Sequence, residues 1–338
     1  MRSQRPSIAI IGAGLMGHWH AAAASRAGAR IAAIVDADGT RGAKLARRHG
    51  STCHTSLAGL LEAAQRPVAA HVCTPLESHA GLVQQLVDGG MHVVCEKPLA
   101  ASASEVVEMV THARRTGRAL CPVHQFTCQH GFLETQSRLG EIGDLRRIAF
   151  TFNSAGGRDR TGERLDAVLR EILPHPLSIL AQLQPAIALE RIEWHCASAA
   201  VGELLATGQH GPATVSISIS LSARPTEASA TLSGTAGTMR LDFFHGYSTL
   251  NRGQASRADK VLRPFANAFV SIGAASGNAL RRVLTWETAY PGLRALFEKF
   301  YGGIEGGRAS APFGDAEVIG IYVARDRIAA AMAREGIR

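Results

Sequence analysis

The sequence has little of what marks membrane-spanning or nucleic-acid-binding proteins. It holds no uninterrupted run of about 18 apolar residues, the length that a membrane-spanning helix needs. Aromatic residues make up only 5% of the 338 residues, and the basic residues are scattered in ones and twos. The net charge of +8 therefore indicates a solvated basic surface rather than the clustered basic and aromatic face that binds nucleic acid. We expect neither a membrane nor a nucleic-acid partner.

Paired cysteine motifs are also lacking. The six cysteines include no CxxC pair. No apolar segment ending in a cleavage site of small residues follows Met1, so a secretory signal is not expected. Thiols in such a chain predict a reducing compartment, and we expect a cytoplasmic protein. The run from Cys121 to His130 holds two cysteines and two histidines, but its spacing matches no common zinc pattern, so we expect no metal site.

The length suggests roughly two domains, and the pattern of apolar runs changes near residue 125. Up to about residue 120, short apolar runs alternate with helical stretches, which is typical of a parallel sheet built from βαβ units. After residue 125, strand candidates follow one another with few helices between them, which indicates an α+β domain. We therefore expect an α/β domain in residues 1–125 and an α+β domain in residues 126–338.

Individual elements can be placed within this division. The run Val215–Leu221 alternates apolar and hydroxyl residues, which predicts a strand with one dry and one wetter face. Ser102 and Glu105 form a capping-box pattern that opens a helix over 103–116. The stretch 261–303 is predicted to be helical with breaks at Pro264 and Pro291, and the closing helix to run from Asp315 to Arg334. Expected strands are 7–11, 31–35, 68–73, 92–95, 119–123, 145–152, 192–199, 213–222, 227–234 and 238–243, and further helices lie near 41–49, 57–64 and 78–88.

A glycine loop, Gly12-Ala13-Gly14-Leu15-Met16-Gly17, follows the first strand and opens a helix. This context makes the GxGxxG pattern a strong sign of dinucleotide binding. The first glycine permits a tight turn, the second lets a pyrophosphate approach the backbone, and the third allows close packing of helix and strand. The amides of Leu15 and Met16, at the start of the helix, would face the phosphates.

Asp36 ends the second strand, nineteen residues beyond Gly17. A carboxylate there can bond the ribose diol and would repel a 2′-phosphate, which favours NAD over NADP. Arg41 lies close enough in the sequence to leave NADP open as the cofactor.

The turn Glu96-Lys97-Pro98 follows the strand 92–95. Charged residues at the carboxyl end of a strand in an open α/β sheet face the ligand crevice. The alternative is an ordinary polar turn ended by Pro98.

Together these motifs resemble the Gfo/Idh/MocA family of nicotinamide-dependent oxidoreductases. The resemblance implies a Rossmann domain with a mostly parallel sheet, followed by an α+β domain with a large, mostly antiparallel open sheet. In the family that sheet often mediates oligomerisation, so a homodimer or homotetramer formed through the C-terminal sheet is expected. The motifs are Gly12, Gly14, Gly17 and Asp36, then Cys73-Thr74-Pro75 with His79, then Met91–Pro98, Gly140–Gly143 and Leu232–Leu241.

The same resemblance implies roles for single residues. Lys97 would lie beside the nicotinamide and hydrogen-bond the reacting oxygen, where a cation stabilises developing negative charge. The Lys97–Pro98 bond would be cis, the form that only a proline makes accessible at low energy. The residues expected at the cofactor are Cys73, Thr74, Pro75, His79 and Glu96, besides those of the glycine loop, Asp36 and Arg41.

The family places a proton-accepting histidine in its second domain, with acids four residues before and three after. His175 is the candidate here, with Glu171 as the first acid and Ser178 in place of the second. Pro176 suits the first position of a helix, which would put His175 at its N-cap, where the dipole favours neutral imidazole. The alternative is a loop histidine satisfied by backbone groups.

Three further residues are predicted to face the substrate. His124 and Gln125 come just after the strand 119–123, and Arg158 lies in a Gly/Arg-rich loop, 154–166. Arginine forks suit carboxylate or phosphate groups, so the substrate would be acidic or phosphorylated. A solvated loop is the alternative.

The resulting expectation is an NAD(P)-dependent dehydrogenase or reductase that acts on CH–OH of a sugar, cyclitol or related metabolite. Lys97 would polarise the oxygen, His175 would transfer the proton, and Glu171 would orient either His175 or the small-molecule substrate. Two alternatives stay open. The first is a relative that uses tightly bound NAD for transient oxidation, in an elimination or hydrolysis without net redox. The second is a non-catalytic dinucleotide-binding regulator.

Overall fold

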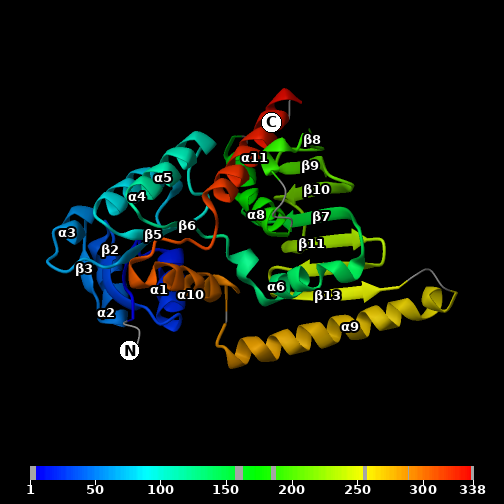
Figure 1. Cartoon of the computed structure of the whole chain (residues 1–338), viewed down its shortest axis with the longest axis horizontal. Coiled ribbons are helices and arrows are strands. Elements are labelled where there is room, and N and C mark those ends of the chain that lie inside the picture. The colour runs from blue at the N-terminus through cyan, green and yellow to red at the C-terminus, as the bar shows by residue number, and fades with distance from the viewer. Residues whose placement is uncertain (1–4, 157–162, 184–187, 254–256, 288, 336–338) are drawn as a thin grey trace. The chain divides into compact units, whose positions relative to one another are not determined.

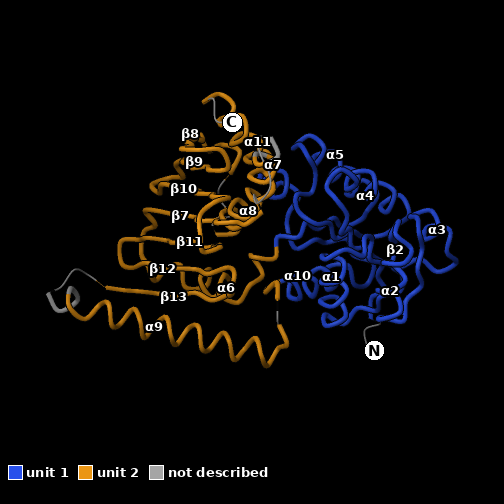
Figure 2. Tube along the Cα trace, turned by 180° about the vertical axis from the view of Figure 1, so that it is seen from behind, with its two compact units in different colours: residues 1–124, 293–322 blue, residues 125–292, 323–338 orange. Residues whose placement is uncertain are grey.

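The computed structural model describes residues 5–156, 163–183, 188–253, 257–287 and 289–335. The chain divides into two compact units, coloured separately in Figure 2. Unit 1 comprises Met1–His124 and Leu293–Tyr322, and unit 2 comprises Gln125–Gly292 and Val323–Arg338. The first boundary lies one residue from the expected one, but residues 293–322 return to unit 1. The reason is packing, because a helix in this segment contacts the first helix of unit 1.

Unit 1 is built on a six-stranded sheet in the order β3-β2-β1-β4-β5-β6, and every neighbouring pair is parallel. All residues of β4 and β5 are buried, as expected for parallel strands covered on both faces. Ile11 pairs with Val72 and Val72 with Cys95, so the loops after β1, β4 and β5 leave one edge of the sheet side by side. The strands are β1 (Ser7–Ile11), β2 (Arg30–Val35), β3 (Thr52–His54), β4 (Ala69–Val72), β5 (His92–Cys95) and β6 (Leu120–Pro122).

The helices of unit 1 pack in two groups, α1 against α10 and α4 against α5 (Figure 1). The predicted capping box of α5 is confirmed, since Ser102 and Glu105 exchange side-chain and backbone hydrogen bonds. The helices are α1 (Leu15–Arg26), α2 (Gly39–His49), α3 (Leu57–Leu61), α4 (His79–Asp88), α5 (Ala103–Arg115) and α10 (Leu293–Ile304), with short 3₁₀ turns η1 (Leu76–Ser78) and η5 (Glu305–Gly307).

Unit 2 contains a seven-stranded sheet in the order β13-β12-β11-β7-β10-β9-β8. It is mostly antiparallel, and β7 pairs with β10 in parallel. The predicted alternation in β10 is confirmed, because Val215, Ile217 and Ile219 are buried while Ser216 and Ser218 are not. The predicted fold class is confirmed. The strands are β7 (Leu145–Asn153), β8 (His195–Ala197), β9 (Glu203–His210), β10 (Ala213–Ser220), β11 (Glu227–Gly234), β12 (Gly237–Asp242) and β13 (Tyr247–Arg252).

Two predictions about the C-terminal helices have different outcomes. The closing helix is confirmed as α11 (Asp315–Arg334), whereas the break at Pro264 is wrong because α9 (Arg257–Leu284) runs through it. A proline inside a helix lacks its own amide hydrogen and crowds the carbonyl oxygen four residues earlier, but α9 continues through Pro264. None of the described helices is long and apolar enough to cross a membrane. The other helices are α6 (His130–Ser137), α7 (Glu163–Ile172) and α8 (Pro174–Leu183), with η2 (Gln125–Cys128), η3 (Leu139–Ile142) and η4 (Leu189–Arg191).

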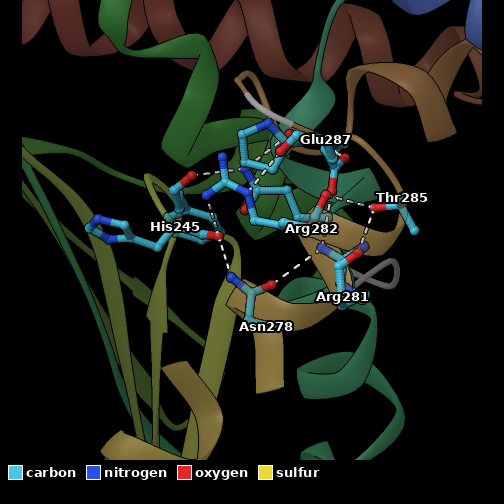
Figure 3. A network of polar contacts seen from close by, with 10 residues as sticks. His245, Asn278, Arg281, Arg282, Thr285 and Glu287 are labelled. Carbon is cyan, nitrogen blue, oxygen red and sulfur yellow. Dashed lines mark hydrogen bonds and ion pairs between the residues drawn. The ribbon is translucent and has the colours of Figure 1, made fainter. Parts of the chain in front are cut away.

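The helix α9 contacts β13, and residues near its C-terminal end hydrogen-bond the turn before that strand (Figure 3). Asn278 and Arg282 both donate to the carbonyl oxygen of His245, at 2.7 and 3.3 Å. Arg281 bonds Glu287 just beyond the helix, at 3.0 Å. Four large apolar residues of this helix are 62–74% exposed, so they do not belong to the core of this chain. They are Phe265, Phe269, Ile272 and Leu280.

Candidate functional site

The glycine loop after β1 has the close approaches that its spacing predicts. Gly12 has a φ of +94°, and a Cβ there would lie 2.8 Å from the carbonyl oxygen of Cys73. A Cβ at Gly17 would overlap the carbonyl oxygen of Gly12, whereas one at Gly14 would meet open space. The protein's own backbone therefore requires the first and third glycines, and the second leaves room for a ligand. The first amides of α1, including those of Leu15 and Met16, have no partner within the helix.

Asp36 lies at the end of β2 and is buried. Its carboxylate accepts from the amides of Ala13 and Asp38, at 2.6 and 2.8 Å. Arg41 adds a two-pronged contact at 3.0 and 2.8 Å. Burial raises the pKa of Asp36, but the bonds from Arg41 and the two amides outweigh it and hold the pKa below its ordinary value. These four bonds fill the roughly four lone-pair positions of a carboxylate.

His79 lies within hydrogen-bond distance of two loops at the edge of the sheet, the loop after β4 and the turn after β5. Its ring is buried, with Nδ1 3.0 Å from the carbonyl oxygen of Pro98 and Nε2 2.9 Å from that of Thr74. It thus ties the loop after β4, which holds Cys73, Thr74 and Pro75, to the turn after β5. The Lys97–Pro98 bond in this turn is cis, as the resemblance implies. That these residues touch the cofactor stays a prediction.

Glu96 and Lys97 directly follow β5 at this edge. Glu96 is buried, and its Oε1 lies 2.9 Å from Nε2 of His20 while its Oε2 accepts from the Lys97 amide at 3.1 Å. Burial raises the pKa of Glu96, but the hydrogen bond from His20, the nearby charge of Lys97 and the bond from the Lys97 amide leave it below its ordinary value. The carboxyl group is therefore ionised at neutral pH, beside the half-buried side chain of Lys97.

His124 and Gln125, predicted to face the substrate, are both buried. Burial, with a smaller contribution from the charge of Lys97, lowers the pKa of His124 to about 3, so its ring is neutral. The ring lies edge-on to Phe313, with centroids 5.4 Å apart. The amide oxygen of Gln125 has no hydrogen-bond partner among the described residues, which is unusual for a buried acceptor. Arg158, the third predicted substrate residue, lies outside the described residues.

His175 lies in the first turn of α8, because this helix begins at Pro174. The expectation that the helix begins at Pro176, with His175 as its N-cap, is therefore wrong. Either proline suits a first helical position, and the earlier one takes it. The His175 ring stacks on Phe126 at 4.6 Å and lies nearly parallel to Phe152 at 6.2 Å.

The two flanking positions of the family pattern also have defined places. Glu171 lies in the last turn of α7 and is half-buried. Ser178 is buried, and its hydroxyl donates to the carbonyl oxygen of His175 at 2.9 Å. The residue that replaces the second acid therefore bonds the backbone of His175 itself.

Four buried polar residues around the Glu96–Lys97 turn were missed in the sequence. His20 bonds Glu96, and the hydroxyl of Tyr322 accepts from the amide of Leu99 at 2.7 Å. His71 and Tyr301 bond each other at 3.0 Å. A histidine inside an otherwise apolar strand was the available signal for His71, whereas Tyr301 and Tyr322 lie more than 200 residues away in the chain.

The sequence of this chain is similar to those of known oxidoreductases. Residues 7–124 match the GFO_IDH_MocA model, described as an oxidoreductase family with an NAD-binding Rossmann fold. An inositol 2-dehydrogenase of Saccharopolyspora erythraea is 32% identical over 144 residues, which cover 40% of this chain and 42% of that protein. A scyllo-inositol 2-dehydrogenase (NADP(+)) of Bacillus subtilis is 26% identical over 64% of this chain and 69% of its own length.

Solved structures share the fold over nearly the whole chain. An NAD-binding oxidoreductase from Klebsiella pneumoniae superposes with a TM-score of 0.77 at 19% identity, covering 98% of both chains. A levoglucosan dehydrogenase has a TM-score of 0.76 at 15% identity, again over 98% of each chain. The predicted resemblance is confirmed over residues 7–124, which match the NAD-binding Rossmann domain of the Gfo/Idh/MocA oxidoreductases.

Proposed function

We propose that the chain is an NAD-dependent dehydrogenase acting on a secondary alcohol or ketone of a sugar, cyclitol or related polyhydroxylated metabolite. The observation that carries the proposal is the place of Lys97, which directly follows β5 at the carboxyl edge of a parallel sheet, the same edge that the glycine loop leaves after β1. The relatives support the substrate class, because their names include inositol 2-dehydrogenases and a D-glucoside 3-dehydrogenase. An acidic or phosphorylated substrate is a narrower form of the proposal that rests on Arg158.

The residues around the glycine loop fit a dinucleotide. Gly14 borders open space, and the first amides of α1 can bond the pyrophosphate. Asp36 can accept the ribose hydroxyls once Arg41 turns aside, and Arg41 itself can face a 2′-phosphate, so NADP stays open. When bound, the nicotinamide supplies the carbon that accepts or gives the hydride.

The catalytic roles follow from the chemistry of the side chains. The Lys97 ammonium donates to the oxygen of the reacting carbon and stabilises negative charge as it develops there. His175 takes the hydroxyl proton in oxidation and returns it in reduction, and its place in the first turn of α8 favours the neutral imidazole that a base needs. Glu171 orients His175 or the substrate, while His124 and the buried amide of Gln125 contact substrate hydroxyls.

A second reaction is favoured by one observation, the replacement of the second family acid by Ser178. The Ser178 hydroxyl is used on the His175 backbone, so it supplies no carboxylate to the site. A relative that holds NAD tightly and oxidises its substrate only transiently, before an elimination or hydrolysis, would fit this change. Such a protein would be purified with its cofactor and would accumulate no NADH.

We also infer a cytoplasmic homodimer or homotetramer formed through the sheet of unit 2. The exposed apolar side chains of α9, which contacts the edge strand β13, support the assembly. The six cysteines, all in the described part of the chain and all present as thiols, support a reducing compartment. A monomer in light scattering at micromolar concentration would contradict the assembly.

The decisive experiment replaces Lys97 by Ala. Sugars, cyclitols and keto compounds are first screened for a change in NADH absorbance, and kcat is then measured on the best substrate. We expect kcat to fall by roughly 10²- to 10³-fold, because the group that stabilises the oxygen is lost. NAD affinity, measured by fluorescence, should change little.

Lys299→Ala, which removes an exposed lysine of α10, is the matched control and should keep full activity. A near-normal kcat in Lys97→Ala would exclude the assigned role of Lys97. Tight NADH binding without turnover of any compound would favour a regulator instead.

A further inference from the structure

A chain of buried polar side chains leads from Tyr301 to Glu96 within unit 1. Nε2 of His71 lies 3.0 Å from the Tyr301 hydroxyl, and Nδ1 of His71 lies 3.2 Å from Nδ1 of His20. Nε2 of His20 then lies 2.9 Å from Oε1 of Glu96. Both histidines are completely buried, and each ring lies within 5.0 Å of the Phe297 ring, measured between centroids.

The positions of the hydrogens follow from the partners. An ionised Glu96 only accepts, so His20 must donate through Nε2. In a neutral ring, Nδ1 of His20 is then an acceptor, which requires a hydrogen on Nδ1 of His71. Nε2 of His71 is in turn an acceptor for the Tyr301 hydroxyl. With both rings neutral, every contact holds one hydrogen, and the donation runs in one direction, from Tyr301 to Glu96.

We propose that His71 and Tyr301 are positioning residues that keep His20 neutral, so that Glu96 receives a hydrogen bond without losing its negative charge beside Lys97. The inference rests on the proposed function only in giving Lys97 a catalytic role. A neutral donor orients a carboxylate but does not cancel its charge, whereas an imidazolium does both. The Lys97 ammonium then faces an anion whose charge is constant across the working pH range.

Protonation of His20 would reverse the direction of donation in the hydrogen bonds between His20, His71 and Tyr301. Nδ1 of His20 would become a donor, His71 would have to donate to Tyr301, and the tyrosine hydrogen would lose its acceptor. Among the described residues the Tyr301 hydroxyl has no second partner. Burial lowers the pKa of His71 well below its ordinary value, and burial raises that of Tyr301. Both directions keep the side chains of His71 and Tyr301 uncharged.

The other titratable groups in this region cannot take over the role of His71. Burial raises the pKa of both the Cys73 and Cys95 thiols, so these groups near Glu96 stay neutral. His124 is also neutral. The groups that face the His20–Glu96 pair are thus His71 from β4, Cys73 after it, Cys95 and Lys97 beside Glu96, His124 after β6, and Tyr301 from α10.

The test is nitrogen NMR of the histidine rings in the protein without substrate. In the wild type we expect hydrogen on Nδ1 of His71 and on Nε2 of His20, with neither ring titrating between about pH 9 and about pH 6. In His71→Val, Nδ1 of His20 loses its donor and should take up a proton within this range. In His71→Asn an amide hydrogen can replace the one on Nδ1, so His20 should stay neutral.

Tyr301→Phe removes only the hydroxyl and should allow partial protonation of His20. His92→Gln is the matched control, because His92 is also a buried histidine of unit 1. Its Nδ1 accepts from the Ala119 amide, and the residue takes no part in the hydrogen bonds between Tyr301 and Glu96. A His20 that stays neutral in His71→Val, or one that is already protonated in the wild type near neutral pH, would overturn the proposal.

The activity of the same variants gives a second readout. In His71→Val, kcat relative to the wild type should fall several-fold as the pH is lowered through the range where His20 gains its proton, with little change in KM. An equal loss of kcat at every pH would mean that His71 only supports the fold. Because the NMR result does not depend on turnover, a wrong assignment of Lys97 would leave it unchanged and is recognised separately by Lys97→Ala.

Discussion

Three histidines of unit 1 lie between hydrogen-bond partners, and the histidine assigned to proton transfer in unit 2 lies against aromatic rings. His20, His71 and His79 each have both ring nitrogens within hydrogen-bond distance of a partner. His175 instead stacks on Phe126 and lies parallel to Phe152. Polar partners at both nitrogens determine where the hydrogens lie, while stacking fixes only the plane of a ring. A group whose charge must stay constant needs the first environment, and a proton carrier is better served by the second.

The largest effect that tests this comparison is expected from His175→Phe. The new ring can keep the stack on Phe126 but cannot carry a proton. We expect kcat to fall by roughly 10²- to 10⁴-fold, the range of general acid–base catalysis, while the melting temperature stays close to the wild-type value. Steady-state kinetics and calorimetry provide the two measurements.

Phe126→Leu is the complementary variant, because it removes the stacking ring and keeps the base. It should lower the melting temperature clearly and change kcat little. If His175→Phe lost stability and kept its turnover, His175 would be a packing residue and the contrast between the units would disappear.

Local sequence signals were enough for most of the fold. The apolar runs of β1, β4 and β5 and the capping box of α5 depend on neighbours in the sequence, and the structure has them where expected. The strands β3, β9 and β13 were missed, since most of their residues are exposed or half-buried and show no long apolar run. The return of residues 293–322 to unit 1 was missed as well, because it depends on packing between α1 and α10.

The candidate site was predictable where its chemistry lies in contiguous motifs. The glycine loop, Asp36 and the Glu96–Lys97 turn are of this kind. The hydrogen-bonded pair of His71 and Tyr301 is not, because these residues are 230 positions apart and meet only in the folded unit. The helix start at Pro174 was ambiguous, since two prolines two residues apart both suit it.

Burial of His124 in unit 1 predicts an intermediate effect, which concerns the stability of the folded protein. Its pKa is about 3 in the folded protein, below the ordinary value of 6.5 in the unfolded chain. Between these values only the unfolded chain binds the proton, so stability is complete above about pH 6.5 and is lost as the pH falls. Below about pH 6.5, each pH unit lowers the free energy of unfolding by about 1.4 kcal/mol, which amounts to roughly 2 kcal/mol by about pH 5.

His124→Gln lacks this ionisation, so its unfolding free energy in urea should decline less between these pH values. His195→Gln, which changes an exposed histidine of β8, is the control and should follow the wild type. Parallel curves for wild type and His124→Gln would show that His124 is protonated in the folded protein over this pH range.

The smallest effect concerns Arg41, whose side chain is 52% exposed where it pairs with Asp36. Arg41 occupies the lone pairs that the ribose diol needs, and it is also the cation nearest in sequence to a 2′-phosphate. In Arg41→Ala, NAD affinity should stay unchanged or rise slightly, while NADP affinity should fall by roughly tenfold, the value of one hydrogen bond to a charged group. Arg47→Ala, on the exposed side of the same helix, should change neither dissociation constant measured by fluorescence. Weaker NAD binding in Arg41→Ala, with NADP binding retained, would mean that Arg41 holds Asp36 in its binding orientation instead of competing with the ribose.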